Sequence, residues 1–352
     1  MGILQNEIVE HLLTLIEHGK HGDRLPSQNE LRDEFSVSTV TVRKALEKLE
    51  ARGVIYRLQG KGCFVRHPED APSAIRLFLI VPHGFSFTNE FIFALVNETQ
   101  KLSCHTVLYN YDGNDESLFH ELQRISPQIV LWLAPTLFMH EQTLRNLLAM
   151  PLHVILFNRD YDHPSVNFIS GDFKGDGRAI GVELAKKGVR KVLFLSFDTR
   201  TTYSKGRCEG LCQSIEEAGG KVDVLDVKEH AKAVRRELFF DLESKLADAT
   251  AEILRKKHFD AIVCSQGDVW NAMRIGLAHS GQNMENMWFA TFNELWDDQR
   301  FSPRIIAAIQ PIAKMAEDAV ALASRLLAGG KSERHYYLSR IIDYAQIGEK
   351  SK

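Results

Sequence analysis

Three stretches of helical periodicity, each bounded by a capping or breaking residue, occupy the first 53 residues. The first ends near Gly19, and the second opens on Ser27 and Glu30, the spacing of a capping box. The third follows Ser38 and ends at Gly53. The apolar positions that define the first and third helices are Ile8, Leu12, Leu15 and Ile16, and Val42, Ala45, Leu46 and Leu49.

The second and third predicted helices are joined by a short turn at residues 36–38, which is the arrangement of a helix-turn-helix. Two short β-type segments follow, at residues 54–58 and 63–66. The turn between them, Gln59-Gly60-Lys61-Gly62, is typical of a β-hairpin. These signals predict a winged helix-turn-helix.

Charge is unevenly distributed along the chain, whose formal net charge is −3. Residues 39–66 carry seven basic side chains against Glu47 and Glu50: Arg43, Lys44, Lys48, Arg52, Arg57, Lys61 and Arg66. A local excess of this kind suits the phosphate backbone of DNA. A solvated helix face is the alternative for a charge run taken alone.

The strings GDRLPSQNEL and FSVSTVTVRKALEKLEARGVIYRLQGKGCFV resemble the winged helix-turn-helix of the GntR family. The resemblance implies that the third helix enters the major groove and that the wing tip approaches the minor groove. Thr39 and Asn29 depart from the family, which usually has arginine at Thr39 and commonly a long side chain at Asn29. The DNA-contacting residues expected by position are Ser27, Asn29, Ser38, Thr39, Thr41, Arg43, Lys44, Gly60, Lys61 and Gly62.

Arg43 is the strongest of these candidates, because a guanidinium can bind a guanine edge or a phosphate with two hydrogen bonds. Its alternative is a surface ion pair with Glu47, one helical turn further on.

Residues 68–74 are polar and contain two prolines, so they indicate a linker. Beyond them, short apolar strands alternate with amphipathic helices such as 176–187 and 241–257. This α/β pattern predicts parallel sheets, and its length suggests two lobes. The strand candidates are 76–81, 105–109, 129–133, 153–158, 191–196, 261–265 and 288–292.

The ordered strings IRLFLIVP, LHVILFNRD, FISGDFKGDGRAIGVELAKKGVRKVLFLS, FDAIVCSQGD and SPRIIAAIQPIAKMAEDAV resemble the LacI/GalR-type effector domain, which has the periplasmic-binding-protein fold. A GntR-type head joined to such a domain resembles the arabinose-repressor-like subgroup. We therefore expect a DNA-binding domain at 1–67, a linker at 68–74 and a two-lobed effector domain at 75–346. The first lobe is expected at about 75–159 plus 309–330, and the second at about 162–305 plus the C-terminal end.

In such α/β folds the ligand binds beyond the carboxyl ends of the strands. The resemblance places a ligand-binding arginine at Arg207, whose alternative is a salt bridge between the lobes, and an aspartate where this chain has Asn293. Asp268 is as well explained by helix capping, and two phenylalanines by core packing. The full candidate set is Phe87, Phe91, Asn158, Arg159, Asp160, Arg207, Ser265, Gln266, Asp268 and Asn293.

The sequence contains few signals typical of an enzyme or a membrane protein. The glycines at 60–62 and 175–177 lack the third glycine of a dinucleotide fingerprint, and there is no GxSxG, HExxH or phosphate-loop motif. The five cysteines are scattered, and Cys208 and Cys212 indicate one helix face rather than a metal site. We expect no catalytic residue, cofactor, metal or membrane segment, and a cytoplasmic location.

The sequence thus predicts a ligand-responsive transcriptional regulator, a repressor, that binds double-stranded operator DNA as a homodimer and responds to a sugar or sugar derivative. Two alternatives stay open. One is a regulator that senses a nucleobase-type ligand, and the other is a solute-binding or enzymatic protein of periplasmic fold without a DNA function.

Overall fold

The computed structural model describes residues 3–20, 22–51, 53–58, 61–66, 75–82, 89–101, 104–133, 140–227, 236–295 and 299–349. Contacts group the chain into two compact units. The first is Met1–Arg76 with Ser103–His105, and the second is Leu77–Leu102 with Thr106–Lys352.

The first unit contains three helices and a hairpin, as predicted. Its elements are α1 (Ile3–His18), α2 (Gln28–Phe35), α3 (Thr39–Ala51), β1 (Ile55–Leu58) and β2 (Gly62–Val65). The capping box at the start of α2 is confirmed: Ser27 N–H donates to Glu30 Oε2 at 2.6 Å, and Glu30 N–H donates to Ser27 Oγ at 3.2 Å. Ser36 closes α2 in the left-handed conformation, at φ 49°, so the chain turns directly into α3.

The core of the first unit follows the predicted periodicity with one exception. Leu12, Val42 and Leu46 are fully buried, whereas Leu15 is 38% exposed and Val9 is buried instead. The apolar stripe of α1 is therefore rotated slightly toward Val9. β1 and β2 pair antiparallel, with Ile55 opposite Val65, and both of these residues are buried. The hairpin is thus fixed to the helices at its base.

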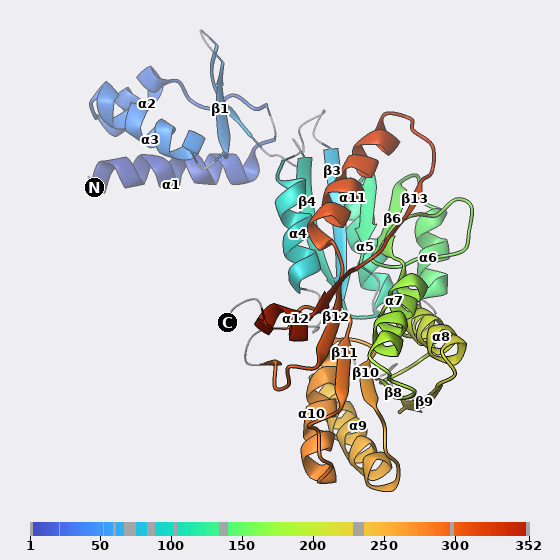
Figure 1. Cartoon of the computed structure of the whole chain (residues 1–352). Helices are drawn as coiled ribbons and strands as arrows, with labels where there is room; N and C mark the ends of the chain where they lie inside the picture. The colour runs from blue at the N-terminus through green and yellow to red at the C-terminus, as the bar shows by residue number, and fades with distance from the viewer. Residues whose placement is uncertain are drawn as a thin grey trace. The chain divides into compact units, whose positions relative to one another are not determined.

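The second unit is built on two six-stranded sheets (Figure 1). The strand order of the first sheet is β13-β7-β6-β5-β3-β4, and β3, β5, β6, β7 and β13 run parallel. Its strands are β3 (Ile75–Pro82), β4 (Cys104–Tyr111), β5 (Ile129–Trp132), β6 (His153–Phe157), β7 (Asn167–Gly171) and β13 (Arg334–Tyr337).

The second sheet has the order β14-β12-β11-β10-β8-β9. It is parallel except for β14, which pairs antiparallel with β12. Its strands are β8 (Lys191–Ser196), β9 (Lys221–Asp226), β10 (Ala261–Cys264), β11 (Trp288–Thr291), β12 (Ile305–Ile309) and β14 (Arg340–Asp343). The predicted α/β fold class with parallel sheets is confirmed.

Helices cover both faces of each sheet, which explains why the strands are apolar on both sides. In the second sheet, α7 and α8 pack on one face and α9 and α10 on the other. The helices of this unit are α4 (Asn89–Thr99), α5 (Asp115–Ile125), α6 (Glu141–Leu148), α7 (Phe173–Lys186), α8 (Thr202–Glu217), α9 (Arg236–Lys256), α10 (Gly267–Ser280), α11 (Ile312–Leu327) and α12 (Tyr344–Glu349).

The chain passes between the sheets after β7, after β12 and after β13. The predicted start of the second lobe near residue 162 is therefore too early, because β7 pairs with β6 in the first sheet. The C-terminal end is also divided between the sheets, since β13 joins the first and β14 the second. Both strands have only four residues and include charged side chains, so they lack the apolar run from which a strand could be predicted.

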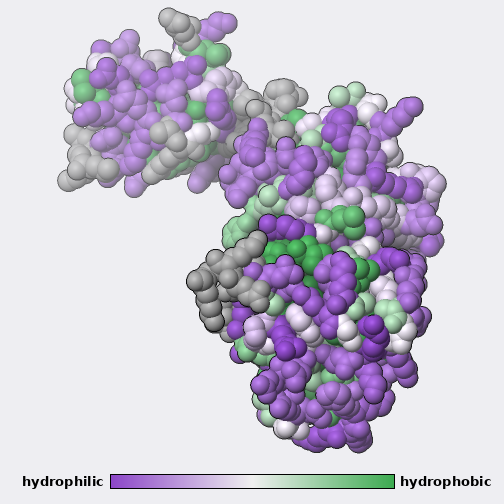
Figure 2. Space-filling model, viewed as in Figure 1, coloured by the Kyte–Doolittle hydropathy of each residue, from purple (hydrophilic) through white to green (hydrophobic). Residues whose placement is uncertain are grey.

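Within the described residues no helix is long and apolar enough to cross a bilayer. On the face shown in Figure 2, hydrophobic surface gathers at the waist of the second unit, where the crossover segments lie. Leu338, in the last crossover, is 64% exposed.

Candidate functional site

The predicted recognition helix presents polar side chains to solvent. Ser38, Thr39, Arg43 and Lys44 are exposed, while Thr41 is half-buried and its hydroxyl lies 3.0 Å from that of Ser38. Ser38 Oγ also accepts the Thr41 N–H at 3.3 Å, so Ser38 caps α3 as predicted.

The remaining DNA candidates lie at the start of α2 and in the wing. Asn29 is exposed, whereas Ser27 is half-buried and holds the capping box. Lys61 is exposed, Gly62 adopts φ 114°, and Gly60 lies outside the described residues. The positive φ of Gly62 is one that other residues adopt only with strain.

The predicted ion pair of Arg43 is present: its Nε lies 3.6 Å from Glu47 Oε1. Both side chains are more than half exposed, at 57% and 54%, and such pairs contribute little stability. The pair therefore leaves Arg43 available to a phosphate or a base. Sequence reasoning missed Val40, which is 52% exposed on α3 and could contact a thymine methyl.

In the second unit, Asn158 has a structural partner. It follows β6 at φ 54° and is buried. Its side-chain amide exchanges hydrogen bonds with that of Gln310, at 3.1 and 3.4 Å. Gln310 lies in the crossover after β12, so this amide pair joins two segments at the junction between the sheets.

Arg159 and Asp160 extend this junction. Arg159 Nη1 donates to the carbonyl of Asn158 at 2.5 Å, and its guanidinium lies 5.0 Å from the ring centre of Tyr203 on α8. Asp160 accepts a hydrogen bond from the Tyr336 hydroxyl at 3.2 Å. Desolvation raises the pKa of Asp160, and its buried Oδ1 has no hydrogen-bond partner among the described residues.

Arg207 is 5% exposed and surrounded by aromatic rings. Its guanidinium lies 4.4 Å from the ring centre of Phe292, 5.2 Å from that of Phe173 and 5.9 Å from that of Tyr203. Arg207 Nη1 donates to the carbonyl of Ser265 at 2.7 Å. Desolvation lowers the pKa of Arg207 to about 10, so it stays charged at neutral pH.

The end of β10 and the start of α10 bring Ser265, Gln266 and Asp268 to the same edge of the sheet. Ser265 is fully buried, and its hydroxyl has no partner among the described residues. Gln266 occupies the N-cap of α10 without a capping hydrogen bond from its side chain. Asp268 lies in the first turn, where burial, reinforced by Glu243, raises its pKa to about 7.

The other predicted ligand residues are less clearly part of this cluster. Asn293 follows Phe292 and is half-buried. Phe91 is 8% exposed and packs edge-on against Phe157 at 6.0 Å, which favours the core alternative. Phe87 lies outside the described residues.

The GxG spacing at residues 175–177 has a packing role. A Cβ on Gly177 would overlap the carbonyl oxygen of Arg207, and one on Gly210 would overlap that of Lys174. These glycines let α7 and α8 approach closely, which places Arg207. Asp176, between Gly175 and Gly177 on α7, is buried and accepts hydrogen bonds from the N–H and hydroxyl of Ser339 at 2.8 and 2.7 Å.

Sequence reasoning missed the aromatic partners of Arg207 and the amide partner of Asn158. Tyr203 lies one helical turn before Arg207, a spacing that could have indicated it. Phe173 and Gln310 gave no such signal, because each follows a strand that the pattern did not predict.

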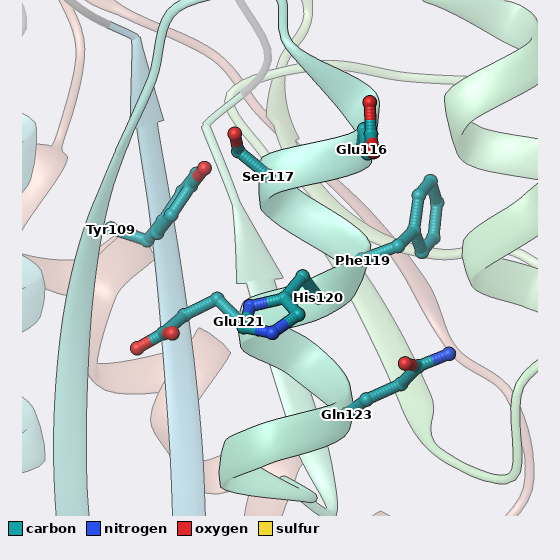
Figure 3. A pocket seen from close by; sticks show the side chains of 7 residues that line it. All are labelled: Tyr109, Glu116, Ser117, Phe119, His120, Glu121 and Gln123. Atoms are coloured by element: carbon teal, nitrogen blue, oxygen red, sulfur yellow. The ribbon is translucent and has the colours of Figure 1, made fainter.

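A separate hollow lies on the first lobe, beside β4 and α5 (Figure 3). Its volume is about 700 Å³, and its lining residues are Tyr109, Glu116, Ser117, Phe119, His120, Glu121 and Gln123. None of the predicted ligand residues is among them.

Cys208 and Cys212 lie on one face of α8 as predicted, with their sulfur atoms 4.0 Å apart. Over the described part of the chain, no group of three or more His, Cys, Asp or Glu side chains is placed to hold a metal ion.

The fold of the second unit is similar to solved structures of bacterial transcription regulators. The transcription regulator CcpA of Lactococcus lactis matches with a TM-score of 0.62 at 14% identity, covering 76% of this chain and 97% of that one. A periplasmic binding protein/LacI transcriptional regulator from Alkaliphilus metalliredigens, complexed with D-xylulofuranose, matches at 0.60 and 15%, covering 76% and 97%. The second unit therefore has the fold of LacI-type regulators.

Residues 4–65 match the family described as bacterial regulatory proteins, gntR family. The chain is 43% identical over 65 residues to the transcriptional repressor NagR of Bacillus subtilis, covering 18% of this chain and 27% of that protein. The arabinose metabolism transcriptional repressor of Geobacillus stearothermophilus is 35% identical over 65 residues, 18% of each chain. The match to NagR thus spans about a quarter of its length. The two predicted resemblances are confirmed.

Proposed function

We propose that this protein is a ligand-responsive transcriptional repressor. Residues 1–67 bind double-stranded operator DNA, residues 68–74 link them to the sensor, and residues 75–346 bind a small effector, a sugar or sugar derivative. The protein acts in the cytoplasm and catalyses no reaction. A ligand that prefers one arrangement of the lobes shifts DNA affinity by no more than its differential affinity for the two arrangements allows.

The observation that carries the proposal is the exposed polar face of α3 within a segment that matches the gntR family. Ser38, Thr39, Arg43 and Lys44 all reach solvent there, beside the exposed methyl groups of Val40. These are the groups that phosphates and base edges require.

We propose that the protein is a homodimer, because one winged helix reads few base pairs and a two-fold pair doubles the contacts. Two exposed apolar side chains of the first lobe support this: Phe93 on α4 is 66% exposed and Leu108 on the edge strand β4 is 43% exposed.

The test begins with selection of the preferred site from a random duplex pool and measurement of affinity by fluorescence anisotropy at several salt concentrations. We expect sequence-preferring, salt-sensitive binding, and a loss of about 1–3 kcal/mol in Arg43→Ala. Lys331→Ala, which removes an exposed charge from the second unit, is the matched control and should bind as the parent does. Binding without sequence preference, or equal affinity in Arg43→Ala, would contradict the proposal.

A further inference from the structure

Two guanidinium groups approach the ring of Tyr203. Arg159 comes from the loop after β6, in the first lobe, and lies 5.0 Å from the ring centre. Arg207 comes from α8, in the second lobe, and lies 5.9 Å from the same centre. Two like charges near one ring repel each other in a poorly hydrated site, and Arg159 contributes, after desolvation, to lowering the pKa of Arg207.

Among the residues that the structure describes, no carboxylate neutralises Arg207 by direct contact. Asp176 acts on it most strongly, but both of its oxygens already accept hydrogen bonds from Ser339. Among the described residues no carboxylate lies within 4 Å of Arg207, and its buried Nε has no acceptor. A buried guanidinium with an unused donor is costly, so the site favours an incoming acceptor with negative charge.

The start of α10 adds to this preference. Ser265, whose carbonyl Arg207 contacts, immediately precedes Gln266, the N-cap residue of the helix, and the Gln266 side chain makes no capping hydrogen bond. The first N–H groups of the helix and the positive end of its dipole therefore lie beside the same site. The buried Ser265 hydroxyl is a further donor without a partner in the described part of the chain. Asp268 carries a proton for much of the time at neutral pH, which reduces its repulsion of an anion.

Building on the proposed regulator, we infer that its effector is an anion, a small hydroxylated molecule whose phosphate or carboxylate group binds between Arg159 and Arg207. Each guanidinium can donate two hydrogen bonds to a pair of oxygen atoms, which both a carboxylate and a phosphate provide. Because the arginines come from different lobes, such a ligand also links the lobes. The anionic group would in this way connect binding to the switch.

The experiment measures the thermal unfolding of the full chain with inorganic phosphate, glucose 6-phosphate, gluconate and glucose, against chloride at equal ionic strength. We expect phosphate at tens of millimolar to raise the Tm by about 2–5 °C, through selective binding to the folded state. At least one of the two organic anions should act at a concentration about tenfold lower than phosphate does, with glucose having no effect. Comparison of glucose 6-phosphate with gluconate then distinguishes a phosphate from a carboxylate ligand.

Arg207→Gln should abolish the shift, and the half-buried Arg159→Gln provides the same test if Arg207→Gln fails to fold. Arg178→Gln, which removes an exposed arginine of α7, and Arg43→Ala, which weakens the basic DNA-binding surface, should retain it. No shift with any anion, or an unchanged shift in Arg159→Gln, would overturn the inference. A Tm increase with glucose alone would overturn it as well. The proposed regulator is tested separately, by the anisotropy experiment: loss of sequence preference, or parent-like DNA affinity in Arg43→Ala, would contradict it whatever the anions do.

Discussion

At the scale of single residues, the second unit places ionisable groups where water is scarce. Arg207 is held by aromatic rings and one carbonyl, Asp160 by one tyrosine hydroxyl, and Asp268 by its position at the start of a helix. Burying such groups lowers the stability of the folded protein relative to burying apolar side chains of similar size. Clusters of residues with shifted pKa values are typical of functional sites. This loss of stability is expected where buried ionisable groups serve to bind a ligand.

Asp268 gives a test of that cost. Its pKa rises from 3.8 to about 7 on folding, so the neutral form is favoured in the folded state. The stability associated with this proton is fully present below pH 3.8 and is lost as the pH rises to about 7. Asp268→Asn should therefore be more stable than the parent by about 2–4 kcal/mol at pH 8, and by much less near pH 4.5.

Chemical denaturation of the parent and Asp268→Asn between pH 4.5 and 8 measures this difference. Asp248→Asn, on an exposed position of α9, controls for the loss of one negative charge. A stability difference that stays constant with pH would show that Asp268 is not the group responsible.

At the scale of elements, the close packing of α7 against α8 positions Arg207, the proposed anion-binding arginine. Gly177→Ala would place a methyl group onto the carbonyl oxygen of Arg207, and neither helix backbone can move away without disturbing the sheet beneath. We expect a loss of about 1–3 kcal/mol in stability and a weaker Tm response to phosphate.

Gln213→Ala, on the exposed face of α8, is the control and should change stability by less than about 0.5 kcal/mol. Thermal unfolding with and without phosphate measures both effects. Parent-like stability in Gly177→Ala would show that the helices tolerate a wider separation.

The pattern of apolar residues predicts some elements of the second unit and not others. Strands such as β8 and β10 are continuous apolar runs and were predicted, as were the caps of α2 and α3. β13 and β14 were missed because they are short and partly exposed. The sequence predicts Arg159 as a ligand residue from its place after a strand, and Arg207 from the resemblance to a known family; both stay predictions. Their shared contact with Tyr203 depends on tertiary packing, which no local pattern encodes.

At the scale of the whole second unit, three crossovers join two sheets, and polar side chains connect them. The Asn158–Gln310 amide pair and the Asp176–Ser339 bonds lie at separate crossovers. Beside the first of these, the contact of Arg159 with Tyr203 also connects the lobes. Specific polar contacts favour discrete arrangements of the lobes over gradual ones, and a switch requires discrete states.

The proposed dimer is the remaining requirement for a switch that acts on DNA. Phe93 on α4 is 66% exposed, and the nearby lobe edge is formed by β4, which carries Leu108. Phe93→Asp should convert the dimer to monomers, because an ionised carboxylate cannot be buried in an apolar interface without a large desolvation cost. Loss of the second head should then weaken operator binding by about 10²-fold or more, since the two half-sites no longer bind together. Light scattering after size-exclusion chromatography measures the mass, and anisotropy measures the affinity.

The control is Ile275→Asp, which changes an apolar, 42% exposed position of α10 in the other lobe and should remain dimeric. A dimeric Phe93→Asp would place the interface elsewhere, whereas a monomeric variant with parent-like DNA affinity would show that a single head suffices.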